Sequence, residues 1–205
     1  MDLSPIGRAA LKSREGEALT AYKDSVGVWT IGVGITTASG LITVKQGLTI
    51  TAATSDALFT EAVKAYAKPV SALGVELKQH QFDALVSLCF NIGPGAFAGS
   101  TVAKRLKAGD ITGAAEAILM WNKPAAIISR RQGEYDQFRT PYAKAMPRAR
   151  RSDKAPVKAP AFMAPELAPP PAILPAPVPV SPGAESAAKP GLLSGWLAAL
   201  LRCVS

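Results

Sequence analysis

Apolar and polar positions near the amino end of the chain predict one helix followed by a β-hairpin. Ser4 and Pro5 make a good helix start, because a hydroxyl side chain caps free backbone amides and proline fits the first helical position. Gly16 is a typical helix end. The run 28–34 is rich in β-branched and aromatic residues and follows a Ser-Val-Gly turn. Residues 21–34 are therefore expected to form a hairpin.

Further along the chain, the spacing of apolar residues becomes that of helices. Five helices are expected: from Thr51 to a break at Pro69, over 81–92, over 100–108, after an Asp110 cap, and onward from Pro124. The glycines and proline of 93–95 are expected to end the second of them. The predicted fold class is α+β and mostly α, with a small N-terminal hairpin lobe and a helical C-terminal lobe.

Proline usage marks where the globular part ends, since eleven of the 17 prolines lie beyond residue 155. Segments rich in proline and alanine favour an extended conformation and bury no core. The length of 205 residues fits one to two domains. We expect a globular domain over 1–147 and a Pro/Ala-rich basic linker over 148–190, so that the domain carries a disordered tail.

The last residues, 191–205, form a different pattern. At helical spacing one face collects six large apolar side chains: Leu192, Leu193, Trp196, Leu197, Leu200 and Leu201. Such a helix is amphipathic and too short to span a bilayer. Two interpretations stay open: it packs back on the domain, or it lies on a membrane surface.

Composition excludes several kinds of enzyme. Because His80 is the single histidine, a multi-histidine zinc site is ruled out, and a Ser-His-Asp triad would have to use this one residue. It opens a predicted helix and is expected to be a surface or capping residue. The two cysteines form no C-x-x-C motif, and no phosphate-binding loop or complete dinucleotide fingerprint is present. We therefore expect no metal and no cofactor.

The net charge of +8 favours an anionic partner, such as nucleic acid, anionic lipid or a bacterial cell-wall polymer. The basic residues are mostly scattered and do not alternate with aromatic ones, so nucleic acid is not expected as a partner. The amino end lacks the apolar core of a signal peptide. The protein is therefore expected to be made as a soluble cytoplasmic chain.

Two carboxylates near the hairpin are candidates for acid–base chemistry. Glu15 falls at the end of the first predicted helix, where the negative end of the helix dipole disfavours ionisation. Asp24 falls beside turn residues whose backbone amides favour the charged form. Two carboxylates in such unlike environments are what glycoside hydrolysis requires. By spacing alone, the alternative is a surface glutamate and a turn-forming aspartate.

The residues around these carboxylates carry a family resemblance. Glu15-x8-Asp24-x5-Thr30, with Arg14, Gly16 and the run Trp29-Thr30-Ile31-Gly32-Val33-Gly34, closely resembles the phage-type lysozymes, endolysins of glycoside hydrolase family 24. Two further blocks agree: 81–101, with Phe90-Asn91-Ile92-Gly93, and Trp121 with Arg130-Arg131-x-x-Glu134. The resemblance covers about residues 3–142.

The resemblance implies a lysozyme-like domain, with a cleft between its two lobes, that cleaves the β-1,4 bond between N-acetylmuramic acid and N-acetylglucosamine in peptidoglycan. It implies that Glu15 protonates the leaving oxygen. Asp24 would activate a water, with the hydroxyl of Thr30 as a second anchor, and the anomeric carbon would be inverted. Inverting enzymes keep their carboxyl groups roughly 6.5–9.5 Å apart to admit that water.

Other residues match the family less firmly. The resemblance implies substrate contacts at Gly34, Phe90 and Ser100, although Phe90 also fits an ordinary core position and Ser100 a helix cap. Arg130 is expected to pair with the catalytic glutamate, the alternative being a solvated helix arginine. The sequence departs from the family at Ile35, where histidine is usual.

The biological role implied is lysis of the host cell and release of phage. We expect a monomer made in the host cytoplasm that acts on peptidoglycan in the periplasm. A holin would have to permeabilise the membrane first. Two other hypotheses stay open: a wall-binding module that has lost its activity, and a membrane-active tail that assists the enzyme.

Overall fold

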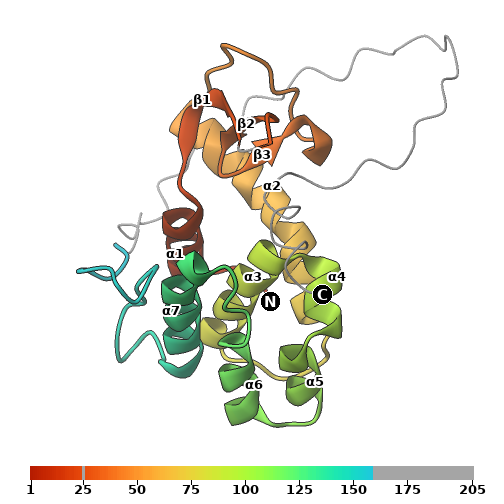
Figure 1. The fold of residues 1–205 in the computed structure, drawn as a ribbon, viewed down its shortest axis with the longest axis vertical. Helices are drawn as coiled ribbons and strands as arrows, with labels where there is room; N and C mark the ends of the chain where they lie inside the picture. Colours follow the sequence, from red (N-terminus) through yellow and green to blue (C-terminus); the bar gives the residue numbers. More distant parts are fainter. Residues whose placement is uncertain (25, 159–205) are drawn as a thin grey trace, which may run out of the picture.

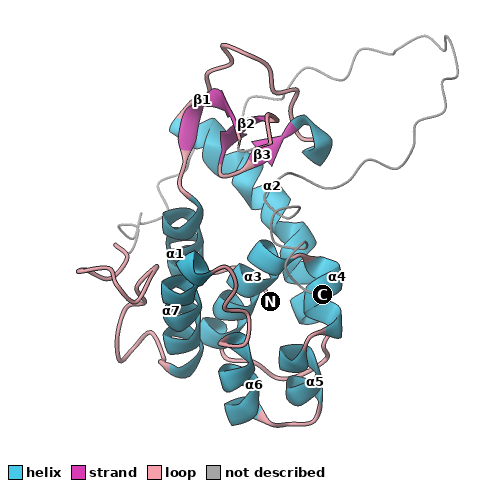
Figure 2. Ribbon diagram, in the orientation of Figure 1, coloured by secondary structure: helices cyan, strands magenta, loops and turns pink. Residues whose placement is uncertain are grey.

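The computed structural model describes residues 1–24 and 26–158. Within them lies an antiparallel sheet in the order β1-β2-β3, together with seven α-helices (Figures 1 and 2). The elements are α1 (Pro5–Glu15), β1 (Ala18–Lys23), β2 (Trp29–Gly32), β3 (Ile35–Thr36), α2 (Ala52–Ser71), α3 (Gln79–Ile92), α4 (Pro94–Gly99), α5 (Thr101–Lys107), α6 (Ile111–Ile118) and α7 (Ile128–Arg139), with short 3-10 turns at Thr37–Ser39 and Ala125–Ile127. The α+β, mostly helical prediction is confirmed.

The sheet forms a small lobe at one end of the molecule, and α2 runs from it into a larger helical lobe (Figure 1). The main core lies in the helical lobe around α3, where Leu85, Val86 and Leu88 are fully buried. A separate cluster under the sheet contains Ile31 and Ile35. Although α1 comes first in the sequence, it packs in the helical lobe against α3.

Both predicted ends of α1 are confirmed. Ser4 caps the helix by accepting a hydrogen bond from the backbone of Gly7 at 3.0 Å, and Gly16 ends it with φ +81°. The cap is tied to α3, because Ser4 and Tyr142 both donate hydrogen bonds to the buried carboxylate of Asp83. The start of α1 is thereby fixed on the helical lobe.

This packing makes Gly7 a sensitive position. A Cβ added there would overlap the carboxyl group of Asp83, which is buried and fully engaged. We expect Gly7→Ala to lower the free energy of unfolding by about 1–3 kcal/mol, as overpacking does. The measurement is urea denaturation. Gly95→Ala is the matched control, since its added Cβ has no neighbour within 4 Å, and an equal loss in both variants would refute the packing argument.

Three helix boundaries differ from the prediction. Pro69 does not end α2, which continues to Ser71. Proline is tolerated there because the last turn loses only one backbone bond. Helix α3 begins at Gln79, two residues early, and ends before Gly93 as predicted, although a further helix, α4, starts directly at Pro94. Helix α7 begins at Ile128, after a 3-10 turn, and not at Pro124.

His80 is also placed differently from the expectation of a surface or capping residue. Its side chain is 6% exposed, and its ring lies edge-on to that of Tyr142. The expectation failed because residues 140–142 close over the start of α3, which no local pattern indicates.

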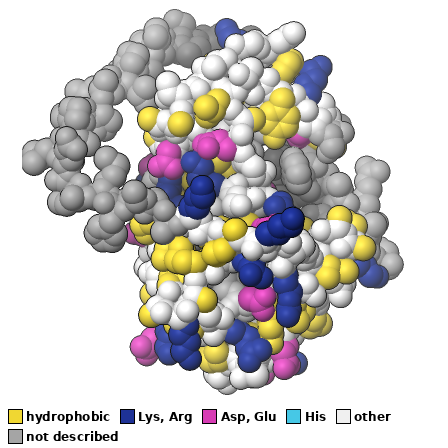
Figure 3. Space-filling model, turned by 90° about the vertical axis from the view of Figure 1, so that its left-hand side faces the viewer, with side chains coloured by type: hydrophobic (Ala, Val, Ile, Leu, Met, Phe, Trp, Pro, Cys, Tyr) yellow, Lys and Arg dark blue, Asp and Glu magenta, His cyan; other side chains and the backbone are white. Residues whose placement is uncertain are grey.

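Basic and acidic side chains are interspersed on the face of the molecule shown in Figure 3.

Residues 146–158, called the strap below, follow α7 in the sequence and pack back against α1 and α7. Ala149 and Val157 of the strap are buried with Ala10 of α1. The described part of the predicted linker at 148–190 is thus packed on the helical lobe. The rest of that linker and the predicted helix at 191–205 lie outside the described residues. Among the described helices, none has the length and apolarity that crossing a membrane requires.

Candidate active site

Glu15 occupies the last position of α1, immediately before the turn at Gly16. Its side chain is 12% exposed, and its carboxylate forms an ion pair with Arg130 of α7 at 2.6 Å. Of the two adjacent arginines, Arg130 is thus the one that reaches this glutamate. The pair links the last residue of α1 to the first turn of α7.

Arg130 is itself held by a second carboxylate, that of Glu134, which is fully buried. The Nε of Arg130 lies 3.0 Å from Glu134, which also pairs with Arg131 and accepts a hydrogen bond from Ser87 at 2.7 Å. Burial raises the pKa of Glu134, but Arg131 and Arg130 outweigh it and lower the pKa to about 2. Glu134 therefore stays charged and holds Arg130 in the position in which it pairs with Glu15.

Asp24 follows β1 directly and is 9% exposed. Its Oδ1 accepts hydrogen bonds from the backbone amides of Val26 at 3.0 Å and Val28 at 2.9 Å. Its Oδ2 is buried and has no hydrogen-bond partner among the described residues. One oxygen is thus held by the hairpin turn, while the other has unused capacity to accept a hydrogen bond.

Thr30 lies on β2 and is 1% exposed. Its hydroxyl donates a hydrogen bond to the carbonyl of Val28 at 3.1 Å. Because Val28 also binds Asp24 through its amide, one residue orders both side chains. The hydroxyl keeps free acceptor capacity.

The charges of both candidate carboxylates act on Tyr22 of β1. Burial raises the pKa of Tyr22 above its usual value, and the charges of Asp24 and then Glu15 raise it further. One phenol therefore lies within electrostatic range of both carboxylates. Tyr66 on α2 is likewise within range of Glu15, since its pKa is raised by burial, Cys89 and Glu15.

A groove of about 280 Å³ lies between the β3 region and the middle of α2. Its walls include the backbone at Gly34 and the rings of Phe90 and Tyr66, whose centroids are 4.5 Å apart. Gly34 and Phe90 thus line one groove. Ser100 is not among its lining residues; it is buried and caps α5 by accepting a hydrogen bond from Ala103 at 3.1 Å.

The sequence model described as "Phage lysozyme" matches residues 12–134. The endolysin of Salmonella phage P22 is 45% identical over 143 residues, covering 67% of this chain and 98% of that protein. The chain belongs to the phage lysozyme family. This phage lysozyme is accordingly a glycosidase.

Solved structures agree with this phage lysozyme assignment. The crystal structure of a P22 lysozyme mutant is 42% identical, with a TM-score of 0.64 over 68% of this chain and 99% of that one. The muramidase domain of SpmX from Asticaccaulis excentricus is 36% identical, with a TM-score of 0.62 over the same share of each chain.

Sequence reasoning assigned no site role to two residues that the structure of this phage lysozyme brings to the site. Tyr66 belongs to the apolar stripe of α2, and this pattern predicted only a core residue. Glu134 was part of the Arg130-Arg131-x-x-Glu134 block, and its spacing of four from Arg130 on a helix was the available signal. Among the described residues, no three His, Cys, Asp or Glu side chains gather as metal ligands.

Proposed function

We propose that this phage lysozyme is an endolysin with muramidase activity. It hydrolyses the β-1,4 bond between N-acetylmuramic acid and N-acetylglucosamine in bacterial peptidoglycan, with inversion. The observation that carries the proposal is the buried Oδ2 of Asp24, which has no hydrogen-bond partner among the described residues, because a carboxylate oxygen in this state favours binding of a catalytic water. The muramidase named among the structural relatives supports the same substrate.

In the proposed mechanism Glu15 is the general acid and protonates the glycosidic oxygen as its bond to the anomeric carbon breaks. A water held by Asp24 and the Thr30 hydroxyl attacks that carbon from the opposite face, and Asp24 takes its proton. Arg130 orients the Glu15 carboxylate through their 2.6 Å ion pair. No bound group other than water enters the reaction.

The groove between the β3 region and α2 provides the substrate contacts of this proposal. Phe90 and Tyr66 offer an apolar wall, and Gly34, which is exposed and has φ +73°, leaves the backbone accessible to a saccharide. Ser100 also stays a predicted contact, although its hydroxyl is engaged as the cap of α5.

The proposed biological role is lysis of the host wall for phage release, supported by the endolysin of phage P22. The enzyme would work as a monomer, made in the host cytoplasm and reaching periplasmic peptidoglycan after a holin opens the membrane. The proposed organisation is a catalytic domain over 1–147, a linker over 148–190 whose first residues, up to 158, pack on that domain, and a short amphipathic helix over 191–205 that contacts either a membrane surface or the domain.

The test is digestion of purified peptidoglycan, with products identified by mass and by the NMR signal of the newly formed anomer. Hydrolysis at muramic acid with release of the α-anomer is expected, since inversion converts a β bond to an α product. Anhydro-muramic acid ends would mean a lytic transglycosylase instead. A folded protein that binds the wall without releasing fragments would favour the wall-binding module.

A further inference from the structure

We propose that the strap is part of the catalytic unit and that Arg150 is a positioning residue for Glu15. The inference rests on the proposed role of Glu15 as general acid. It assigns a function to residues beyond 12–134, the part matched by the family's sequence model. Three groups of contacts carry it.

The first group runs from the strap to the end of α1. The guanidinium of Arg150 donates hydrogen bonds to the carbonyl oxygens of Arg14 at 2.8 Å and Ser13 at 3.4 Å. These carbonyls belong to the last turn of α1, where helix carbonyls have no partner within the helix and a cation is favoured. Arg150 thereby holds the backbone of the residue directly before Glu15.

The second group runs back from α1 to the strap. Arg14 is 4% exposed, and it donates hydrogen bonds to the carbonyl oxygens of Ala149 at 2.9 Å and Arg148 at 3.3 Å. It also reaches Gln137 of α7 at 2.8 Å. Burial lowers the pKa of Arg14 to about 10, so it stays charged at neutral pH. Two arginines thus join α1 and the strap in both directions.

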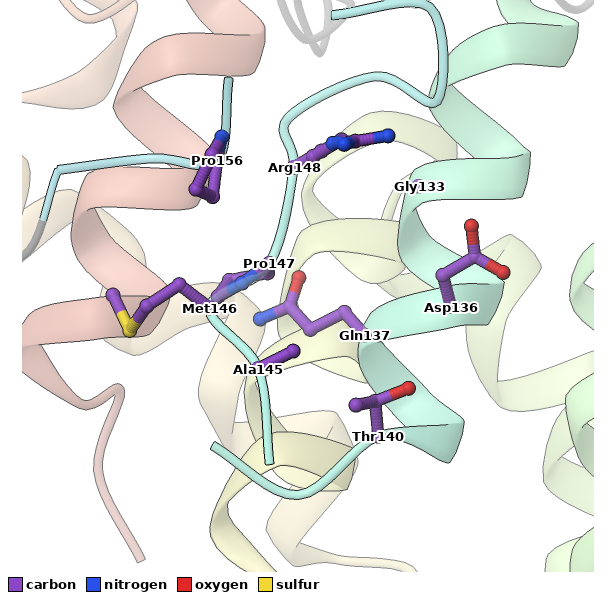
Figure 4. Close-up of a pocket in the computed structure, with 9 residues that line it drawn as sticks. All are labelled: Gly133, Asp136, Gln137, Thr140, Ala145, Met146, Pro147, Arg148 and Pro156. Atoms are coloured by element: carbon purple, nitrogen blue, oxygen red, sulfur yellow. The ribbon is translucent and has the colours of Figure 1, made fainter. Parts of the chain in front are cut away.

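The third group lies between the strap and α7; Figure 4 shows Arg148 of the strap near Gly133 of α7. A side chain at Gly133 would collide with the carbonyl of Ala149, so the glycine permits the close approach. Farther along, the backbone of Arg151 donates a hydrogen bond to the carbonyl of Ser129 at 2.9 Å.

The strap therefore spans the two helix ends that carry the Glu15–Arg130 ion pair. Helix ends fray, and α1 ends at the residue that must deliver the proton. Misplacement of a catalytic group by about 1 Å costs on the order of 100-fold in rate. Arg150 acts on Glu15 only through the α1 backbone, so its loss should lower kcat and leave KM unchanged.

The test compares Arg150→Ala and Arg150→Lys with Arg151→Ala in the full chain. Arg151 is the matched control, because it has the same charge, its side chain is 59% exposed, and its nearest carboxylate is 4.0 Å away. We measure kcat and KM on purified peptidoglycan per folded molecule, with the folded fraction taken from circular dichroism. Arg150→Ala is expected to lose about tenfold or more in kcat, Arg150→Lys less, and Arg151→Ala nothing.

Gly7→Ala separates positioning from stability, because it is expected to weaken the opposite end of the same helix. If it lowers kcat per folded molecule as Arg150→Ala does, the effect is structural and the proposal fails. Equal kcat for Arg150→Ala and Arg151→Ala also refutes it. If Arg150→Ala does not fold, Arg150→Lys decides: an unchanged kcat refutes positioning. A wild-type protein that releases no fragments refutes the proposed function instead.

Discussion

Replacing Glu15 by glutamine is expected to slow the release of peptidoglycan fragments by about 10²–10⁴-fold, the contribution typical of a general acid. Glutamine keeps the size of the side chain but has no proton to give to the leaving oxygen. It also replaces the charged partner of Arg130 at 2.6 Å by a neutral one. The measurement is loss of turbidity of purified peptidoglycan, with circular dichroism to verify that the variant is folded.

Glu17→Gln is the matched control for this prediction. Glu17 lies two residues further on, outside the site, where it pairs with Lys12 at 3.0 Å and accepts a hydrogen bond from Ser55. Glu17→Gln makes the same chemical change, and this variant should clear peptidoglycan at the wild-type rate. A folded Glu15→Gln protein that clears peptidoglycan as fast as Glu17→Gln would remove Glu15 from the mechanism.

Replacing Glu134 by glutamine is expected to lower the free energy of unfolding by about 3–5 kcal/mol, as breaking a buried ion pair does. Glu134 is fully buried between Arg130 and Arg131. Without the charge of Glu134, Arg130 keeps Glu15 as its one carboxylate partner among the described residues, and the buried Arg131 keeps none there. The measurement is urea denaturation at pH 6.

The same variant has a defined pH signature. The pKa of Glu134 is about 2 in the folded protein and about 4.3 in an unfolded chain. A lowered pKa contributes stability that is fully present above the unfolded value and is lost as the pH falls toward the folded one. Wild-type stability should therefore fall between about pH 4 and pH 2, and Glu134→Gln should lack this part of the fall.

Glu61→Gln provides the comparison for Glu134, since Glu61 is exposed and pairs only with Lys64 on its own helix among the described residues. Exposed pairs of this kind contribute at most about 1 kcal/mol. If Glu134→Gln is no less stable than Glu61→Gln, the buried network does not stabilise the protein in the way its geometry indicates.

Features set by neighbouring residues were predictable from the sequence. Ser4, Pro5 and Gly16 fix the ends of α1 through local backbone chemistry, and the run 28–34 contains the predicted second strand. The positions of Glu15 and Asp24 relative to these elements followed directly. The fold class follows from these local features, whereas the choice of the two carboxylates as catalytic residues depends on the family resemblance.

Features set by distant residues were not predictable. Arg14 belonged to the motif around Glu15 without any role being predicted for it, and only the folded chain brings it to Ala149, 135 positions away. Residues 148–158 are basic and belong to the predicted linker, yet they pack because the ends of α1 and α7 present backbone carbonyls to them. Pro69 was expected to end α2, but the loss of helix stability that a proline causes depends on the turn in which it stands.

The contacts of α1 also determine when the site around Glu15 can assemble during synthesis of this protein. Helix α1 emerges first, but its partners are Asp83 on α3, Arg130 on α7 and Arg150 on the strap. An isolated helix of 11 residues is marginal in water, and until α3 is made its long-range contacts are those of Arg8 and Lys12 with α2, at Asp56 and Phe59. The site around Glu15 can close only after residue 150 has been made, which means that translation itself delays assembly of the site until almost three quarters of the chain exist.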